Sequence, residues 1–218
     1  MRWRNLLFDF DGTLVDSAPL HAAAFRAALV QVDAAGARTI DYAPLRGLTT
    51  RAAFRRLGIV DAPALEACVA RKQVHYRDAV RAGRLTVYAG GRSLLRAALE
   101  AGGANFLVTS GSADSINLAL EVMDLKQLFA GVITADDAPA GKPAPDPYRV
   151  CLARFGLNPE ASLAIEDAPS GVIAARAAGL RVAGVHNSAV AQMADFYVAT
   201  LAELSIVLQL DVSAETPQ

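Results

Sequence analysis

The sequence predicts an α/β fold in which a parallel sheet forms the core and an all-helical domain is inserted near its start. Two observations lead to this fold class. From about residue 86 onward, short apolar runs alternate with amphipathic stretches of helical length, which is the pattern of β-α-β units. Between residues 17 and 85 the rhythm changes, because helical stretches follow one another and no convincing strand interrupts them.

Strands are predicted where short apolar runs lie between polar or glycine-containing turns. The first run, at residues 6–8, directly precedes Asp9. Five further runs have the length of buried strands, the last being the weakest: 105–109, 131–134, 162–166, 181–185 and 196–199. Because helical stretches separate most of these runs, we expect the strands to lie parallel in one sheet.

Helices are predicted from amphipathic stretches rich in alanine and leucine. In the second half of the chain these stretches are 92–100, 115–122, 146–155 and 171–178. Gly102, Gly156 and Gly179 lie just beyond three of them, and glycine is typical of the residue that follows a helix.

The segment after the first strand predicts three consecutive helices, at residues 21–32, 49–57 and 63–80. We therefore expect two domains. Residues 1–16 and 86–218 would form the sheet-containing core, and residues 17–85 would form a helical cap. The chain would cross between them near 15–17 and 84–88, where we expect two hinge strands.

Composition excludes several classes of function. The chain has 218 residues, of which 53% are hydrophobic and 20% charged, as in ordinary folded proteins. A net charge of −1 provides no basic field for a nucleic acid or an anionic membrane. No apolar stretch approaches the roughly 20 residues that span a bilayer. Two isolated cysteines, Cys68 and Cys151, indicate a reducing compartment, so we expect a cytoplasmic protein.

Polar residues gather at the predicted ends of the strands. Asp9 and Asp11 follow the first strand, a Thr-Ser-Gly-Ser turn at 109–112 follows the second, and a Glu-Asp pair at 166–167 ends another. Lys142 lies in a loop rich in glycine and proline. Because ligands of open α/β sheets bind beyond the carboxyl ends of the strands, we expect these groups to meet in one crevice.

The charges in this crevice predict a cation and a phosphate. Four carboxylates in one place repel one another unless positive charge compensates them. Mg²⁺ prefers oxygen ligands and also accepts phosphate oxygens, and Lys142 adds a compact positive charge. The hydroxyls and N–H groups at 109–112 open a helix and suit an anion. Each feature alone is common in turns and helix caps, but their order along the chain indicates a magnesium-dependent phosphate site.

These four motifs together resemble the haloacid dehalogenase-like superfamily, in the branch whose helical cap is inserted after the first motif. The resemblance extends from residue 6 to about 204 and rests on four specific strings: DFDGTLVDS, TSGS, GKPAPDPY and EDAPSGV. It implies a Rossmann-like core, a mobile cap, and a Mg²⁺-dependent phosphomonoester hydrolase.

The resemblance also implies roles for individual residues. Asp9 would be the nucleophile and would form an aspartyl-phosphate, while Asp11 would protonate the leaving group and then activate water. Lys142 would hold the transferring phosphoryl group together with Thr109, Ser110 and Gly111.

A metal site is implied by the same resemblance. The Asp9 carboxylate, the Asp11 backbone carbonyl and Asp167 would bind Mg²⁺, and Glu166 would be a direct or an indirect ligand.

Two activities within the superfamily remain open. The string around Asp9 looks more like phosphoglycolate and sugar-phosphate phosphatases, which we favour. His21 and Lys72 resemble residues of β-phosphoglucomutase, so a phosphosugar mutase is the alternative. In the cap turn that contains Gly47, Thr50 stands where a mutase would place an arginine, although Arg51 or Arg46 could substitute. Substrate binding in the cap is therefore expected at His21, Gly47, Arg51 and Lys72.

A signalling receiver domain also combines an acidic cluster with a lysine, but it places its paired acids differently and has no helical insert. We expect the partner to be a small phosphate ester, neither nucleic acid nor membrane, and the protein to be a monomer or a homodimer.

Overall fold

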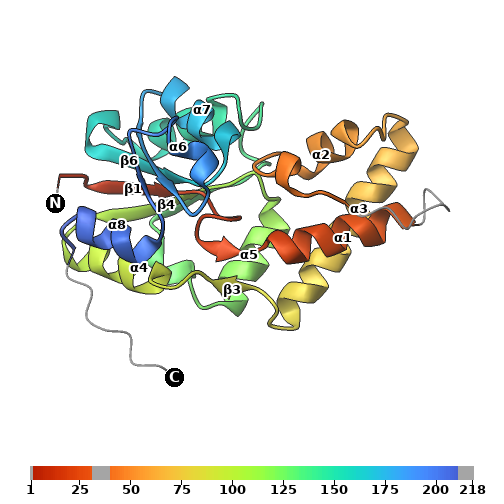
Figure 1. The fold of residues 1–218 in the computed structure, drawn as a ribbon, viewed down its shortest axis with the longest axis horizontal. Helices are drawn as coiled ribbons and strands as arrows, with labels where there is room; N and C mark the ends of the chain where they lie inside the picture. Colours follow the sequence, from red (N-terminus) through yellow and green to blue (C-terminus); the bar gives the residue numbers. More distant parts are fainter. Residues whose placement is uncertain (1, 31–39, 211–218) are drawn as a thin grey trace.

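The computed structural model describes residues 2–30 and 40–210 (Figure 1). Its centre is a six-stranded parallel sheet with the strand order β5-β4-β1-β6-β7-β8. In sheet order the strands are β5 (Gly131–Ile133), β4 (Ala104–Val108), β1 (Asn5–Phe8), β6 (Ser162–Glu166), β7 (Arg181–Val185) and β8 (Phe196–Val198). The first strand of the chain is therefore central, and later strands add on both of its sides. Such a reversal of strand order is where open α/β sheets bind ligands.

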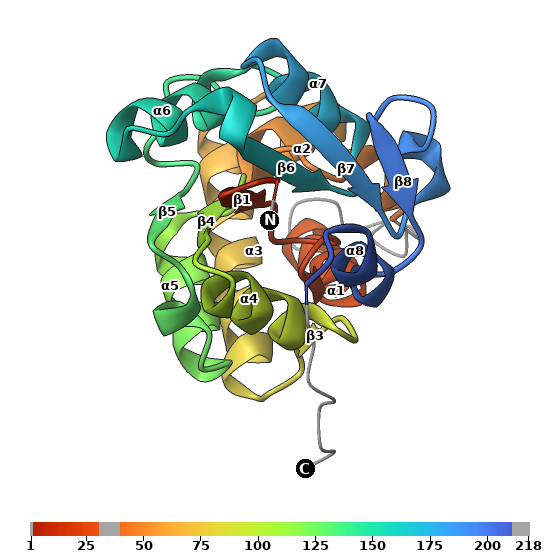
Figure 2. The ribbon, with the colours of Figure 1, turned by 90° about the vertical axis from the view of Figure 1, so that its left-hand side faces the viewer.

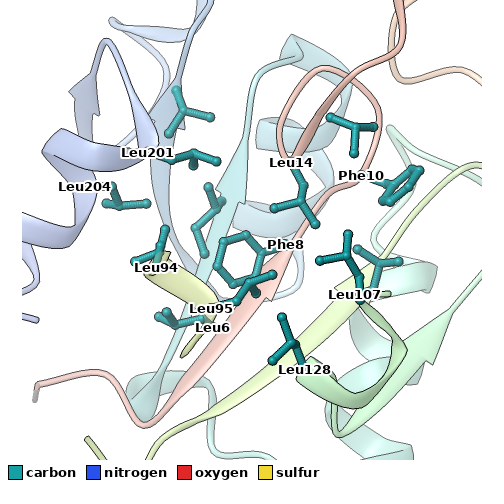
Figure 3. Close-up of a cluster of buried hydrophobic side chains, with 14 of the residues drawn as sticks. Leu6, Phe8, Phe10, Leu14, Leu94, Leu95, Leu107, Leu128, Leu201 and Leu204 are labelled. Atoms are coloured by element: carbon teal, nitrogen blue, oxygen red, sulfur yellow. The ribbon is translucent and has the colours of Figure 1, made fainter. Parts of the chain in front are cut away.

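Helices cover both faces of the sheet, as Figure 2 shows. One face carries α4 (Gly91–Glu100), α5 (Ala113–Val122) and α8 (Leu201–Val207), and the other carries α6 (Asp146–Phe155) and α7 (Pro169–Ala177). Successive side chains of a strand point to opposite faces of the sheet, and the side chains of β1 follow this rule. Leu6 and Phe8 pack with Leu94 and Leu201 in the cluster of Figure 3, whereas Leu7 packs with Tyr148 on the other face.

The helical insert has an apolar core of its own. It comprises α1 (Ala18–Val30), the short 3₁₀ turn η1 (Ala43–Leu45), α2 (Thr50–Arg56) and α3 (Ala62–Arg81). Phe25, Phe54, Leu65 and Cys68 are buried in one cluster that does not include residues of the sheet. In Figure 1 these helices lie beyond one end of the sheet, and α3 also packs against α5.

Two short antiparallel strands connect the insert to the sheet. β2 (Val15–Asp16) leads into α1 and β3 (Thr86–Val87) follows α3; Val15 pairs with Val87 and Asp16 with Thr86. Both crossings of the chain therefore lie side by side.

Most predicted elements agree with the structure to within about two residues. Six strands and four core helices occur where the apolar pattern placed them. The helix predicted at 21–32 begins earlier, at Ala18, and its predicted last two residues lie outside the described part of the chain. The sequence analysis missed α8, although Thr200 and Glu203 carry the spacing of a helix start and the Thr200 side chain accepts a hydrogen bond from the Glu203 N–H. Among the described residues no helix has both the length and the apolar character to cross a membrane.

Candidate active site

The predicted catalytic groups meet at the carboxyl end of the central strands. Asp9 directly follows β1, Thr109 follows β4, and Asp167 follows β6. β4 and β6 are the two hydrogen-bonded neighbours of β1, so their ends are adjacent. All three residues are buried, with at most 4% of their surface exposed.

Lys142 binds the nucleophile candidate directly. Its ammonium lies 2.7 Å from Asp9 Oδ1, 2.6 Å from Glu166 Oε1 and 2.8 Å from the carbonyl oxygen of Val108. These contacts match the three N–H donors of a lysine side chain. Burial lowers the pKa of Lys142, but the charges of the two carboxylates outweigh burial and raise the pKa above its usual value. The ammonium therefore stays charged.

Tyr148 belongs to this cluster and was missed by the sequence analysis. Its hydroxyl donates to Glu166 Oε1, and the Lys142 ammonium lies 5.1 Å from the centre of its ring. The residue is fully buried in the first turn of α6. The signal was present, because Tyr148 ends the same string that contains Lys142, but an aromatic residue at a helix start is usually part of the core.

Three of the carboxylates form a group that suits a metal ion. One oxygen each of Asp9, Glu166 and Asp167 lie within 4.8 Å of one another. Glu166 Oε2 and Asp167 Oδ2 are buried without a hydrogen-bond partner in the structure. Buried polar atoms normally have such partners, so Glu166 Oε2 is available to a cation, and Asp167 Oδ2 has only the Arg46 guanidinium at 3.6 Å beside it. Oxygen donors of this type fit Mg²⁺ or a similar hard cation.

Burial raises the pKa values of the same three carboxylates. Burial, together with the Asp9 charge, raises the pKa of Asp167 to about 7. Burial likewise raises the pKa of Glu166 to about 8, although Lys142 opposes this, and burial raises the pKa of Asp9. A bound cation would favour the ionised form of all three.

The loop after β1 is held against Asp167. Thr13 donates from its hydroxyl to Asp167 Oδ1 at 3.2 Å, and the Arg46 guanidinium lies 3.6 Å from Asp167 Oδ2. Gly12 has a φ of +87°, and a side chain there would collide with the Asp167 carboxylate. Glycine at this position therefore allows the loop to approach the carboxylate cluster closely.

Asp11 lies between the core and the cap helices. The His21 Nε2 atom is 2.8 Å from Asp11 Oδ1, and the Tyr76 hydroxyl donates to the same oxygen at 3.5 Å. Burial raises the pKa of Asp11, but the charge and hydrogen bond of His21 outweigh burial and bring it to about 2. Burial and the charge of Lys72 in turn lower the pKa of His21, whereas the charge and hydrogen bond of Asp11 raise it.

Lys72 places a second buried ammonium in the pocket. Its nitrogen lies 5.2 Å from the ring centre of Phe25 and 4.9 Å from that of Tyr76, and only 5% of the residue is exposed. Burial lowers the pKa of Lys72 to about 8, because the Asp11 charge compensates the loss of water only in part. A site that holds a cation at this cost suits an anionic or strongly polar ligand.

The turn at residues 109–111 faces the turn that contains Gly47 across the pocket. Ser110 donates to the Gly47 carbonyl at 2.8 Å, and the Gly111 N–H donates to the Thr109 hydroxyl at 3.0 Å. The pocket between them has a volume of about 30 Å³, and its lining includes Asp9, Asp11, His21, Gly47, Lys72, Thr109, Ser110 and Gly111. That volume suits one or two water molecules.

Arg51 is the one predicted binding residue that the structure keeps away from this pocket. Its guanidinium forms hydrogen bonds with both carboxylate oxygens of Glu66 on the exposed face of the cap helices. The neighbouring Thr50 lines the pocket instead. The sequence could not separate these two positions, because adjacent residues at a helix start point in different directions.

Comparisons with known proteins agree with this geometry. A family model described as haloacid dehalogenase-like hydrolase matches residues 6–185. The chain is 32% identical over 200 residues to hexitol phosphatase A of Escherichia coli, which covers 87% of this chain and 86% of the relative. It is also 32% identical over 206 residues to phosphoglycolate phosphatase of Salmonella paratyphi A, with 84% and 81% covered.

Solved structures show the same fold. A crystal structure of CbbY from Rhodobacter sphaeroides in complex with phosphate superposes with a TM-score of 0.80 at 25% identity, covering 93% of this chain and 96% of that chain. A β-phosphoglucomutase from Clostridium difficile superposes with a TM-score of 0.83 at 21% identity, covering 95% of this chain and 96% of that chain, a likeness that concerns the fold alone.

Proposed function

Because the chain belongs to the haloacid dehalogenase-like hydrolases and is a phosphomonoester hydrolase of that family, we propose that it is a Mg²⁺-dependent phosphatase that forms an aspartyl-phosphate on Asp9. The observation that carries the proposal is the contact of the Lys142 ammonium with Asp9 Oδ1, at the end of the central strand. A buried carboxylate beside a fixed ammonium lies where a phosphoryl group needs both a nucleophile and charge compensation.

The first half-reaction transfers the phosphoryl group to the protein. Lys142 occupies Oδ1 of Asp9, so we assign the attack on phosphorus to Oδ2. The phosphorus–oxygen bond of the ester breaks as the Asp9–phosphorus bond forms, and Asp11 gives a proton to the departing oxygen. Without substrate the pKa of Asp11 is about 2, so this step requires that the negative charge of the bound ester raise that pKa and that Asp11 take up a proton as the ester binds. Lys142 and the turn at Thr109–Gly111 neutralise and orient the phosphoryl oxygens.

The second half-reaction releases phosphate. Asp11, now deprotonated, takes a proton from water as the water oxygen attacks phosphorus and the Asp9–phosphorus bond breaks. Inorganic phosphate leaves and Asp9 regains its carboxylate. One carboxyl thus serves as acid and then as base, which requires that bulk water be excluded between the two steps.

A divalent cation fits the acidic group of Asp9, Glu166 and Asp167. Glu166 Oε2 and Asp167 Oδ2 accept no hydrogen bond, which supports this assignment. The Asp11 backbone carbonyl would be a further ligand of the cation. When bound, the cation would offset the charge that phosphate adds to three carboxylates. Mg²⁺ is the cation we propose, because every one of these donors is an oxygen.

The helical insert at residues 17–85 acts as the cap, and the paired strands β2 and β3 act as its hinge. Three observations support this. The insert has its own apolar cluster, its two connections lie side by side, and the cavity between it and the core is too small for a phosphate ester. Closure excludes water, and opening releases the product.

The substrate is a small ester, with phosphoglycolate and sugar or polyol phosphates as the candidates. Both relatives quoted above are phosphatases of such compounds by name. A phosphosugar mutase must hold a second phosphate in the cap, and the pairing of Arg51 with Glu66 removes one cation that could do so. The contacts of His21 with Asp11 keep the mutase as the second candidate, because that histidine resembles a mutase residue.

Phosphate release tests the proposal. Purified protein is incubated with Mg²⁺ and a panel of esters that includes phosphoglycolate, hexitol phosphates, hexose phosphates and β-glucose 1-phosphate. Rapid release from one ester, abolished by chelation, supports a phosphatase and names its substrate. Conversion of β-glucose 1-phosphate to the 6-phosphate with little release would establish the mutase instead.

A further inference from the structure

His186 has a backbone conformation that is unusual for a residue with a side chain. Its φ is +59°, and the N–H of Asn187 donates to the carbonyl of Val185 at 2.6 Å across it. This is a tight three-residue turn at the end of β7, at the same edge of the sheet as the active site. Unfavourable backbone conformations of this kind persist where the surrounding contacts hold them.

The imidazole of His186 contacts three separate segments. Nε2 lies 3.1 Å from the carbonyl oxygen of Thr13, and Nδ1 lies 3.2 Å from that of Ala199. The ring of Tyr88 stacks on it with 4.0 Å between the ring centres. Both polar partners are carbonyl oxygens, which only accept hydrogen bonds, so the imidazole must be the donor. A neutral imidazole has one N–H group and therefore donates to one of the two carbonyls at a time.

Thr13 connects this contact to the carboxylate cluster. The Thr13 hydroxyl donates to Asp167 Oδ1, and the amide of Asn187 donates to the Asp167 carbonyl at 2.9 Å. Two consecutive residues of one turn therefore contact both segments: His186 contacts Thr13 in the loop after β1, and Asn187 binds Asp167, the residue after β6. Asp11 lies on that loop, two residues before Thr13.

Tyr88 connects the contact to the hinge. It follows β3, and its N–H donates to the carbonyl of Leu14, the residue before β2. The ring of His186 thus touches the incoming connection of the cap through Thr13 and the outgoing connection through Tyr88.

We propose that His186 is a positioning residue of the phosphatase, which fixes the Thr13 turn to the core so that Asp11 and Asp167 keep their alignment while the cap moves. The inference rests on the proposed function of the site, and His186 itself contacts no group that we assign to the chemistry. Because small displacements of reacting groups cost much of the rate, the loss of this contact lowers turnover rather than substrate affinity.

The test compares His186→Ala and His186→Gln with the wild type. Glutamine carries an N–H donor at about the distance of Nε2, so it keeps a bond to the Thr13 carbonyl. His75→Ala is the matched control, since His75 is an exposed histidine on α3. We measure kcat and KM with the best ester, thermal unfolding, and hydrogen exchange of the amides of residues 12–15, of which Gly12, Leu14 and Val15 donate hydrogen bonds within the loop.

For His186→Ala we expect kcat to fall about ten- to hundredfold with KM changed less than about twofold, as for a lost positioning contact. Exchange at residues 12–15 is expected to accelerate while exchange in β1 and β6 stays slow, and His186→Gln should recover part of both losses. An unchanged kcat, or faster exchange throughout the sheet, would show that His186 serves only the stability of the fold and would overturn the proposal.

The exchange measurement separates this inference from the proposed function. If the wild type releases no phosphate from any ester, the proposed function fails. The hydrogen-exchange rates of the amides of residues 12–15 still test whether His186 fixes the loop. Unchanged exchange rates in His186→Ala would refute this role.

Discussion

The Lys142 ammonium and the Asp9 carboxylate lie 2.7 Å apart in the centre of the site, both shielded from water. Glu166 shares the same ammonium at 2.6 Å. Lys142 therefore offsets the charge of two buried carboxylates and holds the Asp9 side chain, the proposed nucleophile, in place.

Lys142→Met removes this charge with little change in volume. We expect kcat to fall about a hundred- to a thousandfold, the usual loss when a stabilising donor of the transition state is removed. Unfolding of the metal-free protein in urea should show a loss of about 3 kcal/mol or more, because a buried ion pair is broken. Lys126→Met, at an exposed lysine, is the control and should match the wild type in both measurements.

Asp9→Asn tests the covalent step. The variant keeps the size of the side chain but lacks the nucleophilic oxygen, so turnover is expected to vanish while the circular dichroism spectrum is retained. Mass spectrometry after rapid acid quenching should detect a phosphorylated species for the wild type and none for the variant. Asp114→Asn, at an exposed aspartate, should behave as the wild type. Substantial phosphate release by Asp9→Asn would rule out Asp9 as the nucleophile.

Lys72→Met tests a conflict between stability and function. The pKa of Lys72 falls from 10.5 to about 8 on folding, so between these values the unfolded chain binds more protons and stability rises with pH. Below pH 8 the buried Lys72 ammonium is charged, and its burial lowers the free energy of unfolding of the wild type by about 3 kcal/mol, as the pKa shift converts. The variant should therefore be more stable at pH 7, and the difference should disappear above pH 10.5, where Lys72 is neutral in both states.

The same variant should lose kcat/KM, since the pocket loses its second cation. Chemical unfolding at pH 7 and at alkaline pH measures the stability, with Lys126→Met as the exposed counterpart. A variant that is less stable than the wild type at pH 7 would mean that Lys72 is held by favourable contacts and carries no burial cost.

Metal removal tests the acidic group. Chelation should abolish phosphate release, and Mg²⁺ should restore it. Saturating Mg²⁺ should also raise the thermal midpoint, because a ligand at about a hundred times its Kd stabilises by about 2.7 kcal/mol. Asp167→Asn should lose both the activity and the metal-dependent rise in the midpoint, whereas Asp114→Asn should keep both. A midpoint that does not respond to Mg²⁺ in the wild type would contradict the metal site.

Much of the fold was predictable because its strands are buried on both faces. Such strands appear in the sequence as short apolar runs, as at 162–166, and this signal needs no knowledge of the partner strand. α8 was not predicted, because a seven-residue helix has too few turns to show a clear helical periodicity of apolar residues. Its start is marked only by Thr200 and Glu203.

The sequence by itself determined which residues come together at the core site. Asp9, Lys142 and Asp167 each lie next to a strand end or a conspicuous loop, and the topology of parallel sheets brings such positions together whatever the details of packing. Those residues could therefore be named before any contact was known.

The tertiary structure alone decided how the cap and the neighbouring loops complete that site. It placed Thr50 rather than Arg51 in the pocket, buried Tyr148 against Glu166, and brought His186 to the Thr13 carbonyl. These outcomes depend on side-chain direction and on contacts between segments up to 173 residues apart. Local sequence carries no periodic signal for such contacts, because they arise only when separately folded elements pack against one another.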